Sequence, residues 1–373
     1  MIMTKNKTVK NPLLSQIQAA ITAVLTTEDH TSGHCDITDV LRREILEVLL
    51  SYAERIPHPA GGEDAYANTL IRWQILAYVA SIDLTIAKWF ESHLDALTIL
   101  HEVGAATTTQ KASQDSMSGL WAVWAADGPI LEFEPNKDSQ AGKVNGTKAW
   151  CSGARFVDYG LMTYRDAQGR SQLLIVDMRQ DGIVIDDSSW QAVGMQATDT
   201  AAIAFTDVTA MQVGAADAYL ERAGFWHGAA GVAACWYGAT TALAQYLITS
   251  YQQKPNHYKA MYLGQINTAL FGTQQCFYHV AELMASQPQS HHELAIRALR
   301  ASTEQSARQV LEDIGQALGA APFCTNAHFA RLAADLPVFI RQSHGAFDLQ
   351  TIGELTSKTH DKHTKHQRNL WQL

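Results

Sequence analysis

Residues 144–154 read VNGTKAWCSGA, and the fold is deduced from this stretch outward. Its Asn145-Gly146 pair is typical of a tight turn between strands. A large aromatic side chain, a hydroxyl and a glycine follow within eight residues, and together they can line one side of a flat, ring-shaped ligand. The alternative interpretation is an ordinary core tryptophan with a turn behind it.

The chain around this stretch, from about 118 to 212, has a β pattern. Short apolar runs occupy residues 173–176, 183–185 and 202–205. Turn signals separate the runs, notably Gln168-Gly169 and Asp181-Gly182. Short strands at this spacing predict a small barrel or sandwich.

Helical patterns lie on both sides of the β region. Ile82, Ile86 and Trp89–Phe90 recur at the spacing of one helical face, and the Pro- and Gly-rich residues 57–62 read as a loop between helices. After about residue 213 long Ala-rich helical stretches continue nearly to the end. The predicted fold class is α+β, with an N-terminal helical domain (1–117), a middle β domain (118–212) and a C-terminal helical bundle (213–373).

Composition excludes several classes of partner. Of 373 residues, 28 are Lys or Arg and 37 are Asp or Glu, so the net charge is −9, which argues against nucleic acid and anionic membranes as partners. The five cysteines are scattered without a CxxC pair, as expected of reduced thiols. No run of about 20 apolar residues and no signal-peptide pattern occurs, so we expect a cytoplasmic protein.

Several common site motifs are missing. The sequence has no GxGxxG, no GxxxxGK[ST] and no GxSxG, so Rossmann, P-loop and serine-hydrolase sites have no support. His360, His363 and His366 lie three apart in a polar terminus without a carboxylate or cysteine at ligand spacing. A solvated tail explains them, and no metal site is predicted.

Taken together, the motifs resemble those of the acyl-CoA dehydrogenase family of flavoproteins. Residues 144–154 are similar to that family's NGxKxWxSGA, residues 190–200 to its W…GMRxTxS, and residues 205–208 to its FxDV. The flanks agree more loosely: residues 91–96 are similar to EGHxxA, and Arg331 with Asp335 follows the spacing of RxxRDA.

The resemblance implies FAD held between the β domain and the C-terminal bundle, in homodimers or homotetramers. Residues that match the flavin-ring segments of the family are Trp124, Ala125, Ala126, Trp150, Cys151 and Ser152. The family's threonine is replaced by Ala126, which leaves only backbone groups there. Residues that match segments reaching the FAD phosphates and adenosine of a neighbouring subunit are Lys254, Gln316 and Gly319.

The sequence departs from the family at the catalytic base. Members remove a substrate α-proton with a glutamate, and His344 stands at that position, while the alternative position within residues 227–231 has no carboxylate either. A GSD segment that helps hold the FAD phosphates is also missing after residue 129. His344 is a candidate base, a flavin contact, or a helix-end histidine paired with Asp348 or solvent. His93 is a weaker candidate for the same roles, and the nearby acids Glu91 and Asp95 are expected to cap or pair within the bundle.

The leading functional hypothesis is therefore an FAD-dependent oxidoreductase that desaturates an acyl thioester or similar acyl substrate, with His344 as base and an electron-transfer partner. CoA as the carrier is left open. The alternative is a two-component flavin-dependent monooxygenase on the same fold, which requires a flavin reductase. A third interpretation is a scaffold that binds flavin or another ligand without catalysis.

Overall fold

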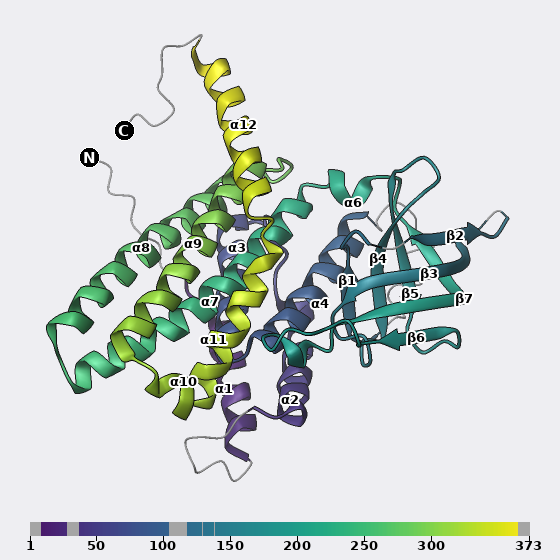
Figure 1. Cartoon of the computed structure of the whole chain (residues 1–373). Helices are drawn as coiled ribbons and strands as arrows, with labels where there is room; N and C mark the ends of the chain where they lie inside the picture. The colour runs from purple at the N-terminus through teal and green to yellow at the C-terminus, as the bar shows by residue number, and fades with distance from the viewer. Residues whose placement is uncertain (1–8, 28–36, 104–117, 129, 138, 365–373) are drawn as a thin grey trace.

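The computed structural model describes residues 9–27, 37–103, 118–128, 130–137 and 139–364; His366 lies outside them. Helices lie at both ends of the chain and strands in the middle (Figure 1). The N-terminal elements are α1 (Pro12–Thr27), α2 (Asp39–Leu50), η1 (Ala53–Arg55), α3 (Ala65–Ile82) and α4 (Leu84–Val103). Within the described ranges no helix is both long enough and apolar enough to cross a membrane.

The expected single helical face from Ile82 to Phe90 is wrong, because the chain breaks at Asp83. The carboxylate of Asp83 accepts hydrogen bonds from the backbone N–H groups of Thr85 (2.8 Å) and Ile86 (3.1 Å), so it caps the start of α4. Arg42 also donates to it at 3.0 Å, which compensates the burial of this carboxylate. Ile82 therefore ends one helix and Ile86 belongs to the next.

The middle of the chain forms one seven-stranded mixed sheet. The strands are β1 (Trp121–Trp124), β2 (Leu131–Pro135), β3 (Ala141–Cys151), β4 (Tyr159–Arg165), β5 (Ser171–Asp177), β6 (Ile183–Asp186) and β7 (Ala201–Val213). Their order is β1-β4-β5-β7-β3-β2, with β6 paired to β7. Only the β1–β4 pair is parallel among these described strands. The three apolar runs predicted as strands lie in β5, β6 and β7.

The Asn145-Gly146 pair does not form the predicted turn but lies inside β3, where the register with β7 shifts. Gly146 has φ 111°, and a Cβ there would lie 2.3 Å from the carbonyl oxygen of Ile130. The Asn145 side chain accepts a hydrogen bond from the backbone N–H of Asp207 at 2.8 Å. The pair thus makes a bulge that bends the strand instead of ending it. Gln168-Gly169 does form a turn, between β4 and β5.

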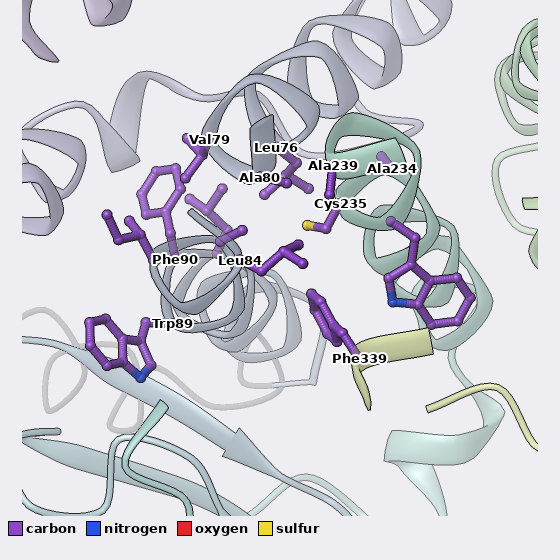
Figure 2. Close-up of a cluster of buried hydrophobic side chains, with 14 of the residues drawn as sticks. Leu76, Val79, Ala80, Leu84, Trp89, Phe90, Ala234, Cys235, Ala239 and Phe339 are labelled. Atoms are coloured by element: carbon purple, nitrogen blue, oxygen red, sulfur yellow. The ribbon is translucent and has the colours of Figure 1, made fainter. Parts of the chain in front are cut away.

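The C-terminal elements form a bundle with α3 and α4. They are α6 (Ala218–Glu221), α7 (Gly224–Gln253), α8 (His257–Ser286), α9 (Glu293–Leu318), α10 (Ala321–Thr325), α11 (Ala327–Phe339), η4 (Ile340–Gln342) and α12 (Ala346–Thr364), while η3 (Gln196–Thr198) lies between β6 and β7. Figure 2 shows Leu76 and Leu84 packed near the small residues Cys235 and Ala239 of α7. A Cβ on Gly238 would lie 2.0 Å from the Ala77 carbonyl oxygen, so small residues allow α3 and α7 to touch.

Helix α4 joins the bundle to the sheet. The Trp89 indole N–H donates to the carbonyl oxygen of Thr198 (2.9 Å), and Ser92 accepts from the backbone N–H of Val123 in β1 (2.8 Å). From α11, the Asp335 carboxylate accepts a hydrogen bond from the backbone N–H of Met195 at 2.5 Å. These contacts fix β1 and the segment from Met195 to Thr198 relative to the helices.

Candidate functional site

Trp150 stands at the end of β3 with its side chain in solvent. It is 62% exposed, and its ring meets the ring of Trp190 edge-on at 6.3 Å between centroids. Its backbone has φ 62°, in the left-handed region that a bulky residue rarely adopts. Neighbouring Cys151 is fully buried and anchors the strand. The cost of this backbone conformation is thus spent on a residue whose flat ring is exposed at the surface.

A chain of hydroxyl groups fixes the hydrogen-bonding direction of Ser152. Thr198 donates its proton to the carbonyl oxygen of Met195 (2.6 Å), which can only accept. Thr200, 2.8 Å from Thr198, must then donate to it, and Ser152, 2.8 Å from Thr200, must donate in turn. Because each hydroxyl has one proton, the Ser152 oxygen is left to accept a hydrogen bond from a ligand.

Trp150 and Ser152 form a surface that we call the wall, and the end of β1 supports it. Trp124 is buried, and its indole N–H donates to the carbonyl oxygen of Ser152 at 3.1 Å, so its ring holds the wall but does not line it. Lys148 donates to the carbonyl oxygen of Ala126 (2.8 Å) and to that of Thr163 (2.7 Å). Burial lowers the pKa of Lys148 to about 8. Ala126 is exposed and Ala125 half-buried, so both remain near the surface.

The second predicted group lies elsewhere. Lys254 caps the end of α7, and Gly319 (φ 68°) ends α9, with no atom within 4 Å of a Cβ placed on it. An open groove of about 790 Å³ between these helix ends is lined by Tyr246, Gln253, Leu318, Pro322 and their neighbours. In the described part of the chain the Lys254 side chain makes no hydrogen bond or ion pair, whereas the Gln316 amide donates to Glu312 (3.0 Å).

These two groups do not meet within one chain. The α9–α10 connection lies at the end of the bundle remote from the sheet, while Trp150 and Ser152 belong to the sheet (Figure 1). A dinucleotide that touches both groups would have to bridge two chains.

The structure does bring the two expected base positions together. Arg300 donates to the carbonyl oxygens of Ala229 (2.6 Å) and Gln342 (3.1 Å), so residues 227–231 lie beside the segment before His344. His344 is exposed, and its backbone N–H, not its ring, donates to Asp348 (3.0 Å). Asp348 is also ion-paired with Arg297. Asp348 is the only carboxylate within residues 341–348, and it is therefore already bound.

Buried titratable groups on α4 and α7 are the residues that the sequence analysis undervalued. Burial lowers the pKa values of His93 and His227 to about 4, so both are neutral. His93 Nδ1 accepts from the backbone N–H of Trp121 (3.2 Å), which leaves its proton on Nε2. Burial raises the pKa of Glu91 to about 7. The sequence signal for Glu91 was a carboxylate placed among the apolar residues Trp89, Phe90 and Leu94, all of which are buried.

No family model matches this sequence, and no curated protein matches it. Solved structures do match. The dibenzothiophene monooxygenase TdsC from Paenibacillus sp. A11-2, solved with FMN and indole, is 15% identical over 91% of this chain and 96% of its own, with TM-score 0.70. KijD3, solved with FMN and dTDP-3-amino-2,3,6-trideoxy-4-keto-3-methyl-D-glucose, is 16% identical over 93% of each chain, with TM-score 0.72.

Butyryl-CoA dehydrogenase from Megasphaera elsdenii is 14% identical over 93% of this chain and 98% of its own, with TM-score 0.74. The same arrangement of N-terminal helices, central sheet and C-terminal bundle thus occurs in a dehydrogenase and in a monooxygenase. The fold predicted from residues 144–154 and their companion motifs is confirmed: the chain has the acyl-CoA dehydrogenase fold.

Proposed function

We propose that this chain is a flavin-dependent monooxygenase that takes up reduced flavin from a separate reductase. The orientation of Ser152 carries the proposal. Its oxygen is left as an acceptor because its proton is committed to Thr200. Reduced flavin has ring N–H groups that oxidised flavin lacks, so an acceptor at the ring edge favours the reduced form.

The residues at the end of β3 fit a flavin ring. The exposed face of Trp150 offers an apolar wall, Ser152 an acceptor, and the backbone of Ala125 and Ala126 further polar groups. Bound reduced flavin supplies the two electrons that activate dioxygen. The wall suits FMN as well as FAD, and FMN is the flavin bound in the TdsC and KijD3 structures. Use of FAD assigns Lys254, Gln316 and Gly319 to the phosphates and adenosine of a neighbouring chain.

Among the described residues the two expected base positions hold no free carboxylate, which also favours oxygenation over desaturation. Desaturation needs a base opposite the flavin. Asp348 is paired with Arg297, and burial keeps His227 uncharged. His344 is left as an exposed imidazole. The single proton on Nε2 of His93 makes that side chain a hydrogen-bond donor toward a ligand, not a base.

Acyl desaturation is the second candidate, and one observation favours it. Glu91 is buried between α4 and α7, and its pKa of about 7 suits a general base at neutral pH. In this function Glu91 would replace the glutamate that His344 displaces.

The two functions are separated by following bound flavin without oxygen and then with it. We expect that no acyl-CoA from a panel of chain lengths bleaches the bound oxidised flavin. We also expect that reduced FMN on the protein reoxidises in air with a delayed release of hydrogen peroxide compared with free reduced FMN. Trp150→Ala should weaken FMN binding at least tenfold. Bleaching by one chain length, with peroxide release as fast as from free flavin, would establish the dehydrogenase instead.

A further inference from the structure

Lys148 of β3 is a buried cation next to the wall. The residue is only 5% exposed. Its Nζ donates to the carbonyl oxygens of Ala126 (2.8 Å) and Thr163 (2.7 Å) and to the Thr163 hydroxyl (3.1 Å). An ammonium has three N–H groups, and these three acceptors use all of them. A neutral amine has only two, so the surroundings of Lys148 fit the charged form.

This charge has no counterion in the described part of the chain, where Lys148 forms no ion pair. The nearby carboxylate of Asp127 is 82% exposed and pairs instead with Arg165 at 3.6 Å. Burial raises the pKa of the neighbouring Cys151 thiol, which is therefore uncharged at neutral pH. Buried charges are normally paired, so an unpaired buried ammonium indicates that an anion completes the site.

The ammonium is charged at neutral pH but titrates at a moderately alkaline pH. Burial is the main cause that lowers the pKa of Lys148 to about 8; the charge of Arg165 acts in the same direction and that of Asp127 against it. The positive charge is therefore lost as the pH rises through about 8. A bound anion would hold the proton on Lys148, and so would bind less tightly above this pH.

The peptide that joins Ala126 to Asp127 connects the ammonium to the surface. Lys148 binds the carbonyl oxygen of this peptide. The peptide is trans, so its N–H points away from Lys148. Within the described residues the Asp127 N–H makes no hydrogen bond, and Asp127 is exposed. Because hydrogen bonds in series polarise one another, the ammonium makes this N–H a stronger donor toward an anion.

A reduced flavin ring is the anion that matches this place. The oxidised ring is uncharged, whereas the reduced ring loses its N1 proton near neutral pH and then carries a negative charge. Charge placed near the flavin ring is a means by which proteins tune this cofactor. The phosphate of FMN is also an anion, but it is present in both redox states and produces no difference between them.

We propose that Lys148 makes the wall selective for the anionic form of reduced flavin, through the peptide between Ala126 and Asp127. The inference rests on the proposed function for the placement of the flavin ring against this peptide. The N1 proton of the reduced ring passes to solvent when the anion binds. Lys148 keeps its own proton and touches no ring atom, so it is a positioning residue that acts through the peptide.

The wild-type chain tests this through pH. Dissociation constants of oxidised and photoreduced FMN are measured on the full chain by anaerobic fluorescence titration at pH 7.5 and pH 9. With a pKa of about 8, the charged fraction of Lys148 falls about eightfold between these values. The preference for reduced over oxidised FMN should therefore fall about fivefold or more. Ser152 does not titrate in this range, so its contribution to the preference stays constant.

Two variants identify the charge. Lys148→Gln keeps two N–H donors for the carbonyl oxygens of Ala126 and Thr163 but removes the charge. It should lower the preference at pH 7.5 about tenfold and abolish its pH dependence. The N1 ionisation constant of the bound reduced ring, followed by its near-ultraviolet absorbance, should also fall about tenfold. Lys143→Gln is the matched control, because Lys143 lies on the same strand with a side chain 43% exposed, and should change neither readout.

A preference that is equal at the two pH values would overturn the inference, as would the same fall in Lys148→Gln or an equal loss in Lys143→Gln. If Lys148→Gln does not fold, the pH dependence of the wild type decides. A pH-dependent preference with peroxide release as fast as from free flavin would contradict the proposed function alone. A constant preference with delayed peroxide release would contradict this inference alone, and a chain that binds no flavin would contradict both.

Discussion

The hydrogen-bonding direction of Ser152 is set by residues outside the proposed flavin surface. The Met195 carbonyl oxygen is the fixed end of the hydroxyl chain, and Thr198 and Thr200 transmit its polarity to Ser152. The same short segment is held in place by Trp89 and Asp335, which belong to α4 and α11. An acceptor next to an exposed Trp150 is thus a product of packing between three parts of the chain.

Thr198→Val should break the hydroxyl chain with little change in shape. Without the Thr198 oxygen that accepts the Thr200 proton, Thr200 and Ser152 can reverse direction, so the preference for reduced over oxidised FMN should fall about tenfold, or about 1.4 kcal/mol. Loss of the buried hydrogen bond should cost about 1 kcal/mol of unfolding free energy. Anaerobic flavin titration and urea unfolding measure the two effects. Thr206→Val, at an exposed position, is the control, and an unchanged flavin preference in Thr198→Val would refute the orientation argument.

Glu91 predicts an unusual pH dependence of stability. Its pKa is raised from 4.5 to about 7, so the folded chain binds a proton more tightly than the unfolded chain. The stability from this group is complete below about pH 4.5 and is lost as the pH rises through about 7. Glu91→Gln should therefore match wild type near pH 5 and exceed it by about 1–3 kcal/mol at pH 8. Urea unfolding at both pH values checks this, and a variant less stable than wild type at pH 8 would show that the ionised carboxylate has a partner.

At the scale of elements, β3 illustrates which features local sequence predicts. Strands such as β5 were predictable because burial along them is continuous, and α7 and α9 because of their helical periodicity. Asn145-Gly146 was mispredicted because a turn and a bulge require the same residue types, and only pairing with β7 decides between them. Asp83 breaks a helix that periodicity alone continues, because its buried partner Arg42 is 41 residues away.

Gly146 should be far less replaceable than a glycine in a true turn. A Cβ at Gly146 meets the Ile130 backbone oxygen at 2.3 Å in addition to the cost of φ 111°, so Gly146→Ala should lose about 3 kcal/mol or more. Gly169 in the β4–β5 turn has φ 76° and open space, so Gly169→Ala should lose only about 1 kcal/mol. Urea unfolding compares the pair, and equal losses would contradict the bulge.

At the scale of the whole molecule, the proposed flavin surface at Trp150 and Ser152 was within reach of sequence analysis, whereas the buried groups around Glu91 were not. Trp150 and Ser152 lie in one contiguous motif, which sequence resemblance locates directly. A small cavity beside Glu91 lies between α3, α4 and α7, with glycines of α7 placed opposite acids of α4 more than 130 residues earlier. Residue types at that separation have no local pattern that joins them.

Two features predict a homo-oligomer: the exposed apolar side chains, and the open groove between the ends of α7 and α9. Tyr258, Met261 and Phe271 are exposed along α8, and Phe347 is exposed at the start of α12. Burying such side chains between copies is favourable by about 25 cal/mol per Å². We expect a dimer or tetramer in sedimentation velocity at micromolar concentration, and dissociation in Phe271→Asp. A wild-type monomer under these conditions would contradict the assignment of Lys254, Gln316 and Gly319 to the flavin of a neighbouring chain.

The central claim is that this acyl-CoA dehydrogenase fold holds reduced flavin for reaction with oxygen. The most direct measurement is the affinity of the full chain for FMN, oxidised and photoreduced, by anaerobic fluorescence titration at one pH. The orientation of Ser152 predicts that reduced FMN binds at least tenfold more tightly. If oxidised flavin binds as tightly as reduced flavin or more so, Ser152 does not act as an acceptor at the ring, and the assignment as a monooxygenase is contradicted.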